Sequence, residues 1–302
     1  VKVTGELRYK YMSKKDDANN GQSFENDLRS RIWVTGQIND DWSYTGMIEN
    51  TQDFYGENAN KGDEDTSFQR AYVEGKLGGL AVTAGRYNAF FANGNIYDAR
   101  VDGAEVSYGD KVKVTGFAGK GTDNAEDTGS FGTYAGGELS ANFNKLNVAA
   151  GYVNFTDINA TNAKHETDLD DAIWYVGADY NFGDVTLSGM YLKGDASEDG
   201  KDITDVNTDG WTAGLTYKGA DASEAGSWGL FANYYDLGGM TYIAHTTDAN
   251  TFDNDGFKGY GVGANYTFAK NIVGTVAYYD TENKLNSKVD DQRVWADLTF
   301  TF

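Results

Sequence analysis

The arginines are the charged residues whose spacing could do chemistry. Five of the seven arginines alternate with apolar residues, so in an extended chain their side chains lie on the polar face. These five are Arg8, Arg29, Arg31, Arg70 and Arg293. Arg86 instead shares the parity of Leu80 and Val82, so we expect either a bulge or an apolar inner face there. The seven arginines are Arg8, Arg29, Arg31, Arg70, Arg86, Arg100 and Arg293.

Carboxylates fall on the same polar face as these arginines. Fixed charges of both signs across a narrow gap produce a transverse field that orders water and discriminates among solutes. The alternative is that the same residues form salt bridges that hold the shape of a wall. The sequence leaves both interpretations open. The candidate acidic residues are Glu49, Glu74, Asp98 and Glu105, with Glu25 and Asp27 nearby.

Other kinds of chemistry have little support. The absence of cysteine excludes disulfides, zinc–thiolate sites and thiol nucleophiles. His165 and His245 are the only histidines, and neither accompanies a nucleophile motif or a metal-ligand pair, so we predict no enzyme and no cofactor. Asp253 and Asp255 in "FDNDGF" resemble part of a calcium loop without its full ligand spacing, and a solvated acidic surface is the favoured interpretation.

Composition narrows the class of protein that can position these charges. The 302 residues include 38 Gly, 21 Tyr, 16 Phe and no Pro, and only 40% are hydrophobic. No apolar run approaches the roughly 18–20 residues of a membrane-spanning helix, but strands of a spanning β-barrel need only about 9–11 alternating residues. The net charge of −21 argues against nucleic acid as a partner.

Strict alternation of apolar and polar residues recurs along the whole chain. Residues 1–11 place Val, Gly, Leu and Tyr on one face and Lys, Thr, Glu and Arg on the other, and residues 24–38 repeat the pattern. Period two is typical of strands with one apolar face. We count sixteen such segments and expect one domain, residues 1–302, that is all-β and closes as an antiparallel barrel.

The connections between these segments are of two alternating kinds. Short turns such as "LGGL" and "YGDK" alternate with long polar segments. Eight long segments, near 13–22, 50–66, 88–99, 120–130, 156–171, 194–209, 237–255 and 281–291, hold 28 acidic and 8 basic residues, which is all but one of the net negative charges. Aromatic residues gather beside the short turns. This division is typical of an outer-membrane barrel, and a soluble β-sandwich gives no reason for it.

These features together resemble the trimeric general-diffusion porins. The resemblance covers the whole chain, and it includes a last strand, "ADLTFTF", whose Phe300 and Phe302 are similar to the assembly signal of outer-membrane proteins. In a closed barrel that strand pairs with the first and needs no cap. The resemblance implies a homotrimer in the outer membrane, in contact with lipid and lipopolysaccharide, that passes small hydrophilic solutes and ions.

One local stretch carries the resemblance further. Residues 84–109, "AGRYNAFFANGNIYDARVDGAEVSYG", are similar to the porin segment in which a third loop folds into the lumen. The resemblance makes 88–99 a constriction loop that includes Phe90, Phe91 and Tyr97, with Tyr87 beside it. The acidic "PEFGG" tip of the enterobacterial form is absent, and Asp98 is the one carboxylate within the loop.

The chain also resembles the barrel portion of the S-layer-homology (SLH) porins of diderm Firmicutes. That resemblance implies a signal peptide and a peptidoglycan-binding N-terminal domain ahead of this chain. We therefore expect an outer-membrane porin, with two alternatives. One is a substrate-specific channel, for which inward Trp33, Tyr72 and Trp295 provide stacking surfaces. The other is a barrel anchor that tethers the outer membrane to the cell wall.

Overall fold

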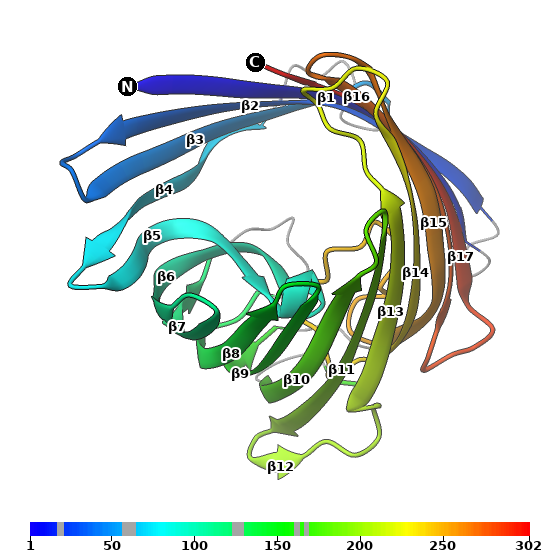
Figure 1. Ribbon diagram of the computed structural model, residues 1–302. Coiled ribbons are helices and arrows are strands. Elements are labelled where there is room, and N and C mark those ends of the chain that lie inside the picture. The colour runs from blue at the N-terminus through cyan, green and yellow to red at the C-terminus, as the bar shows by residue number, and fades with distance from the viewer. Residues whose placement is uncertain (17–20, 56–64, 123–129, 160–163, 166–168) are drawn as a thin grey trace.

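The chain folds into one antiparallel sheet that curves into a closed ring (Figure 1). The structure is a computed structural model and describes residues 1–16, 21–55, 65–122, 130–159, 164–165 and 169–302. Its strands are β1 (Lys2–Asp16), β2 (Gly21–Gln37), β3 (Trp42–Asp53), β4 (Asp65–Leu77), β5 (Leu80–Phe91), β6 (Tyr97–Gly109), β7 (Val112–Gly121), β8 (Thr133–Phe143), β9 (Leu146–Ile158), β10 (Leu169–Asn181), β11 (Val185–Glu198), β12 (Lys201–Asp202), β13 (Asp209–Lys218), β14 (Trp228–Gly238), β15 (Gly256–Ala269), β16 (Ile272–Asn283) and β17 (Asp290–Thr301).

Sixteen of these strands form the wall, which confirms the predicted fold class. Each strand pairs with its neighbours in sequence, and β1 pairs with β17 as well as β2, so the wall has no edge. β12 is a two-residue strand that pairs only with the end of β11. β11 and β13 are neighbours in the wall itself.

The seam of the barrel is completed by a backbone pair beyond the last strand. The amide of Gly5 donates to the carbonyl of Phe302 at 2.9 Å, and the amide of Phe302 donates back at 3.0 Å. The Phe302 ring lies across Gly5, where a Cβ would come within 2.0 Å of the ring. A side chain at position 5 would therefore have to displace the exposed ring of Phe302.

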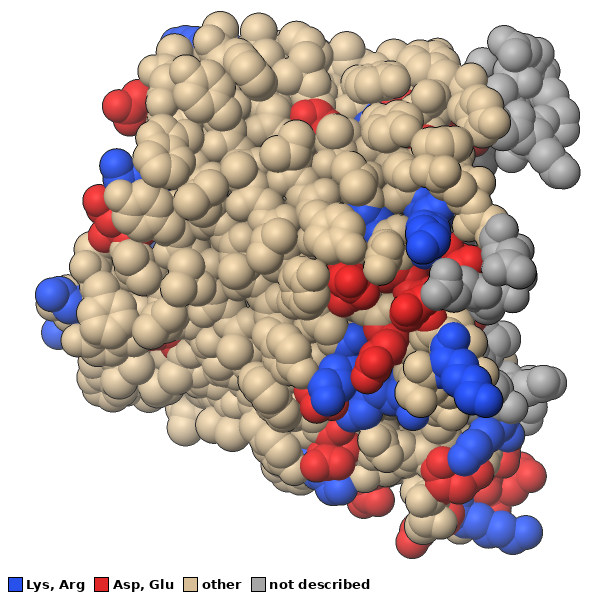
Figure 2. Space-filling view, turned by 90° about the vertical axis from the view of Figure 1, so that its right-hand side faces the viewer, with Lys and Arg blue, Asp and Glu red and all other residues tan. Residues whose placement is uncertain are grey.

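The outer face of the wall is apolar. Exposed side chains such as Val176, Leu215 and Val276 alternate along their strands with inward ones, as the sequence pattern predicts. Figure 2 views the side that carries β13 to β17, where the middle of the surface is largely free of charged residues and charges lie toward two opposite edges, most densely at one. Among the described residues there is no helix of the length and apolar character needed to span a membrane.

The strands end at two distinct levels, which we name the short-turn end and the long-loop end. The short-turn end carries connections such as Gly78–Gly79, which have positive φ angles of 56° and 92° that glycine adopts without strain. Several strands run further toward the long-loop end than their sequence pattern predicts; β11, for example, continues to Glu198. Long loops are therefore shorter, and the wall taller, than expected.

The largest departure from the expected fold concerns β5 and β6. Residues 88–99 were predicted as a loop, but β5 continues to Phe91 and β6 begins at Tyr97, with the 3₁₀ turn η2 (Ala92–Gly94) between them. β5 pairs with β4 only as far as Arg86, and β6 pairs with β7 only from Val101. Residues 87–100 thus form a hairpin detached from the wall, and Figure 1 shows it curving into the ring.

Candidate functional site

The tip of this hairpin, residues 87–100, is anchored inside the barrel by aromatic packing. Phe91 stacks on Phe117 with 4.4 Å between ring centroids, and its ring lies 5.5 Å from that of Tyr134. Phe155 and Tyr97 complete the cluster against the inner face of β7 to β9. The lumen beside these strands is therefore filled with apolar side chains, whereas the sequence pattern alone suggests an open, polar interior.

A second segment also lies inside the lumen. We name residues 239–255, between β14 and β15, the lumen strap. Ala244 of the strap forms a parallel bridge with Tyr97 of the hairpin. The amide of Asp98, also in the hairpin, donates to the carbonyl of Ala244 at 2.8 Å. The hydroxyl of Thr246 donates to the Asp98 carboxylate at 2.6 Å. The hairpin is thus held by the wall on one side and by the strap on another.

The cavity richest in charged residues lies between the hairpin and the wall from β2 to β6; smaller ones of about 510 and 230 Å³ lie beside β6 to β11 and beside β10 to β14. The volume of the charged cavity is about 830 Å³, and Trp33, Tyr72 and Phe90 are among the residues that line it. Most of the remaining lining is polar. The charged residues are Arg29, Arg31, Arg70 and Arg100, with Glu49, Glu74, Asp98 and Glu105.

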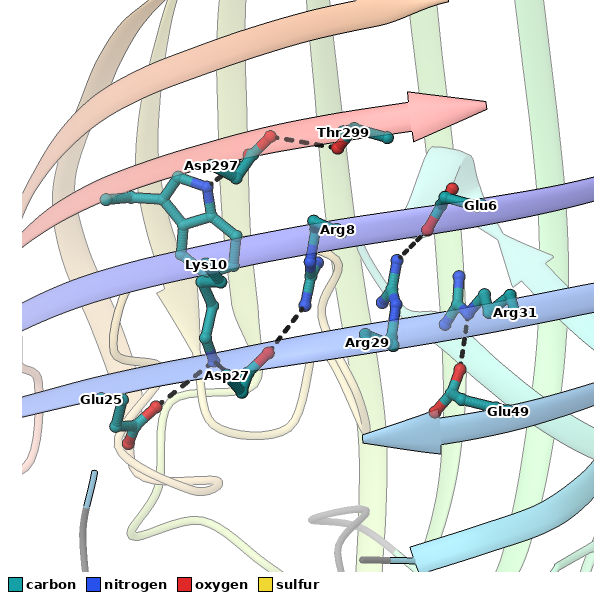
Figure 3. Close-up of polar contacts among 11 residues, drawn as sticks. Glu6, Arg8, Lys10, Glu25, Asp27, Arg29, Arg31, Glu49, Asp297 and Thr299 are labelled. Atoms are coloured by element: carbon teal, nitrogen blue, oxygen red, sulfur yellow. Dashed lines mark hydrogen bonds and ion pairs between the residues drawn. The ribbon is translucent and has the colours of Figure 1, made fainter. Parts of the chain in front are cut away.

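Close ion pairs hold part of this charge in place (Figure 3). Arg31 donates to Glu49 at 2.5 Å and Arg29 donates to Glu6 at 2.6 Å, each between neighbouring strands. These pairs join side chains that are only 17–25% exposed, and they fix the orientation of the guanidinium groups. Arg70 instead donates to Asn88 of the hairpin at 2.7 Å.

The charges are also sorted by depth. Glu74 and Glu105 flank Thr83 in register across β4 to β6, near the short-turn end. Arg70 lies four residues further along β4, toward the long-loop end, in register with Met47 on β3. A solute that enters from the long-loop end therefore first meets the arginine level, where Arg31 is paired with Glu49, and then the level of Glu74 and Glu105.

The structure brings together most of the predicted site residues, but not all. Arg86 is an exception: it forms a two-pronged ion pair with Asp102 at 2.6 and 2.7 Å on the outer face of the barrel. The prediction that Arg86 lines the pore is wrong, because the side chain follows its parity and points away from Thr83 and Tyr87, which line the cavity. Neither a bulge nor an apolar inner face is needed.

Arg8 and Arg293 lie on the inner wall but outside the cavity. The Arg8 guanidinium lies over the Trp295 ring, 5.4 Å from its centroid, and 4.0 Å from Asp27. Arg293 donates to Asp291 at 2.7 Å and to the carbonyl of Asp248 in the strap at 3.1 Å. The predicted basic patch is therefore divided, because the strap lies against one half of it.

Of the predicted hairpin residues, some line the cavity and others are buried away from it. Tyr87 and Phe90 line the cavity, whereas Phe91 and Tyr97 are buried in the aromatic cluster and are not part of its lining. Asp98 accepts hydrogen bonds from Asn88 and Thr246. Phe300 and Phe302 lie at the short-turn end of β17, and their role in assembly stays a prediction.

The sequence pattern did not predict some of the contacts at the site. Gln69 lies at an irregular step in the β3–β4 pairing, between Phe68 and Arg70, and accepts from Arg100. Lys10 pairs with Asp27 at 2.8 Å, and its inward parity was a usable signal. The strap gave no such signal, since a loop has no periodicity, although the apolar run "MTYIAH" is unusual for an exposed loop.

The calcium candidates and one histidine lie in the strap. Asp255 accepts a hydrogen bond from Asn283 at 2.7 Å, and loop-bound calcium stays an untested prediction. His245 contacts Asn95 of the hairpin at 3.1 Å, and burial lowers the pKa of His245 to about 3. The ring is therefore neutral near pH 7. Neither histidine lines the cavity.

His165 links two long loops and should make stability depend on pH. Its ring contacts Glu198 at 2.9 Å and Asp205 at 2.8 Å; burial disfavours the charged ring, but these hydrogen bonds outweigh it and raise the pKa of His165. The stabilisation is complete below the unfolded pKa of about 6.5 and is lost as pH rises through the raised folded value. His165→Gln should lower the melting temperature in acid and have little effect in alkali. A difference that does not change with pH would contradict this assignment.

Comparison with known proteins identifies the fold. No family model matches the chain, and no curated protein matches its sequence. Solved structures do match over all of this chain. They include the trimer form of OmpT from Vibrio cholerae, with a TM-score of 0.62, 18% identity and 98% of that chain covered. OmpF of Salmonella typhi in complex with daunomycin has a TM-score of 0.65, 14% identity and 97% coverage. An anion-selective porin from Comamonas acidovorans has a TM-score of 0.62, 15% identity and 99% coverage.

These likenesses define the class of structure. The chain has the sixteen-stranded barrel fold of outer-membrane porins. At identities of 14–18% the likeness establishes the fold and no more.

Proposed function

We propose that this protein is an outer-membrane porin through which small hydrophilic solutes and ions diffuse. The observation that carries the proposal is the charged cavity of about 830 Å³ inside a closed barrel whose outer face is apolar. Each unsatisfied polar group would cost a solute several kcal/mol in hydrocarbon, and a wet, polar passage removes that cost. The apolar outer face fits contact with lipid and lipopolysaccharide.

The charges around the cavity suggest how solutes are filtered. Arginines paired with carboxylates at one depth, and Glu74 and Glu105 at another, form a field that favours hydrated solutes able to interact with both signs. The long loops carry an excess of acidic residues, which enriches cations within a Debye length of about 10 Å at 0.1 M salt. We propose weak cation preference at the mouth and charge-dependent selection at the cavity.

We further propose that the barrel is a homotrimer. One of the solved structures of the same fold is a trimer form. In this chain the ion pair of Arg86 and Asp102 lies on the outer face, with Lys120 in register beside Asp102. Charged side chains facing lipid cost up to about 2–4 kcal/mol each at the bilayer midplane, so contact with a neighbouring protomer on this side is favoured.

A substrate-specific channel is the second candidate. It is favoured by the aromatic rings of Trp33, Tyr72 and Phe90, which line the same cavity as the arginines and could stack on a sugar or another planar solute. Tethering to peptidoglycan through an N-terminal domain stays a prediction that rests on the sequence resemblance to SLH porins alone.

Single-channel recording in a planar bilayer under a salt gradient tests these proposals together. Large ohmic steps that arrive in threes are expected for an open trimeric porin, and the sign of the reversal potential reports its ion preference. Conductance that saturates with one solute, or is blocked by it, would favour the substrate-specific channel. If folded, membrane-inserted protein gives no conductance, the porin proposal fails.

A further inference from the structure

The lumen strap, residues 239–255, is an ordered element with its own internal contacts. The Tyr242 hydroxyl donates to the carbonyl of Thr251 at 2.6 Å and accepts from the amide of Gly256 at 3.1 Å. Asn254 donates to the carbonyl of Tyr242 at 2.7 Å. Tyr242 is buried at the centre of this arrangement, so both ends of the strap are tied together where it leaves β14 and enters β15.

One side of the strap is bound to the hairpin by backbone groups. The amide of Ile243 donates to the carbonyl of Ile96 at 2.9 Å, and that of Thr246 donates to the carbonyl of Gly94 at 2.9 Å. These bonds flank the single parallel bridge between Tyr97 and Ala244. Gly94 is also required by this contact, since a Cβ there would lie 2.7 Å from the Thr246 side chain.

The other side of the strap is bound to the wall. Ala249 is buried in a cluster with Met12, Ala277, Tyr279 and Trp295, on the inner faces of β1, β16 and β17. Asn250 donates to Asp291 at 3.3 Å, and its carbonyl accepts from Thr281 at 3.1 Å. The strap therefore spans the distance between the hairpin tip and the wall opposite the aromatic cluster.

The arrangement leaves the cavity beside β2 to β6 on one face of the hairpin. Its lining includes Asn88, Phe90 and Asp98 of the hairpin but no residue of the strap and none of β14 to β17. The strap lies against β1, β16 and β17 on the other side of the lumen, and an open space of about 230 Å³ remains between the strap, the hairpin tip and β10 to β14.

We propose that the lumen strap is a positioning element that closes the lumen beside β1, β16 and β17 and fixes the hairpin tip. Solutes are thereby directed to the charged cavity beside β2 to β6. This inference rests on the proposed function in one respect only, that the open cavity conducts. The position of the strap itself can be tested without any conductance.

The first experiment replaces residues 244–250 by two glycines. Conductance per channel should rise at least about twofold, because a second aqueous path opens in parallel with the first. The deletion variant is compared with Thr246→Val, which removes only the hydrogen bond to Asp98, and with Thr208→Val on another loop. We expect Thr246→Val to raise the current noise, but by less than the deletion does. Thr208→Val should leave the noise unchanged.

The second experiment uses the absence of native cysteine. Ala277→Cys places one thiol beneath Ala249, where Ala277 is only 6% exposed. A membrane-impermeant maleimide should label this thiol at least tenfold faster in the deletion variant than with the strap intact. Equal labelling rates in two folded barrels would overturn the proposal.

The two readouts separate the possible failures. Folding of each variant is checked by its heat-dependent shift on a denaturing gel. If the strap protects the thiol introduced at position 277 but neither protein conducts, the porin proposal fails and the strap proposal stands. If the parent conducts and the deletion changes neither labelling nor conductance, the strap proposal fails and the porin stands.

Discussion

Phe91→Ala should destabilise the barrel and open its constriction. The ring is 3% exposed and packs between the rings of Phe117, Tyr134 and Phe155. Truncation of a buried phenylalanine costs about 3–5 kcal/mol, through lost transfer free energy and the cavity that remains. Because Phe91 is the main apolar anchor of the hairpin, the tip should leave its seat and the single-channel current should become larger and noisier.

The neighbouring Phe90 provides the matched control. It lies on the same hairpin strand, but it is 54% exposed and faces the cavity. Phe90→Ala should enlarge the cavity with a change in unfolding free energy below about 1 kcal/mol, as for most exposed positions. Denaturant unfolding in detergent compares the two variants. Equal losses of stability would show that Phe91 does not anchor the tip.

Neutralising the arginine level should change ion selectivity strongly. Arg29, Arg31 and Arg70 all line the cavity. Replacing them by glutamine leaves Arg100 against the carboxylates of Glu49, Glu74, Asp98 and Glu105. A charge at contact distance in water is worth about 1 kcal/mol, which is roughly fivefold in local ion concentration. The triple variant should therefore raise the cation-to-anion permeability ratio by about tenfold or more, measured from reversal potentials.

A second triple variant controls for overall charge. Lys193, Lys218 and Lys258 lie outside the cavity, and their replacement by glutamine changes the net charge by the same amount. The permeability ratio should then change less than about twofold, since salt screens charges that lie outside the cavity. If both variants shift selectivity alike, the net charge controls selection and the arginine level does not.

The wall of the barrel could be predicted from sequence, because a strand repeats its environment every two residues. The same alternation places Arg29 inside and Leu28 outside, and it recurs along the strands of the wall. The barrel closes because the first and last strands would otherwise have unpaired edges. Even the unexpected position of Arg86 obeyed its parity.

The contents of the lumen could not be predicted in the same way. Whether Phe91 packs on the inner wall or faces water depends on residues such as Phe117 and Phe155, which are far away in sequence. The same holds for the strap, whose contacts with Ile96 and Asp98 join segments about 150 positions apart. Apolar runs in both segments indicated burial but gave no partner.

The backbone pair of Gly5 and Phe302 has a consequence for how the chain could be rewired. With its two ends hydrogen-bonded, the sheet has no structural first strand. Phe302 pairs with Gly5, so a circular permutation needs a short linker that spans the four-residue offset to Val1; with that linker it would break none of the pairings. New ends placed between Gly78 and Gly79, in a short turn, would leave the same wall with a different terminal residue. Ring closure and recognition of a terminal phenylalanine are therefore separable properties of this barrel.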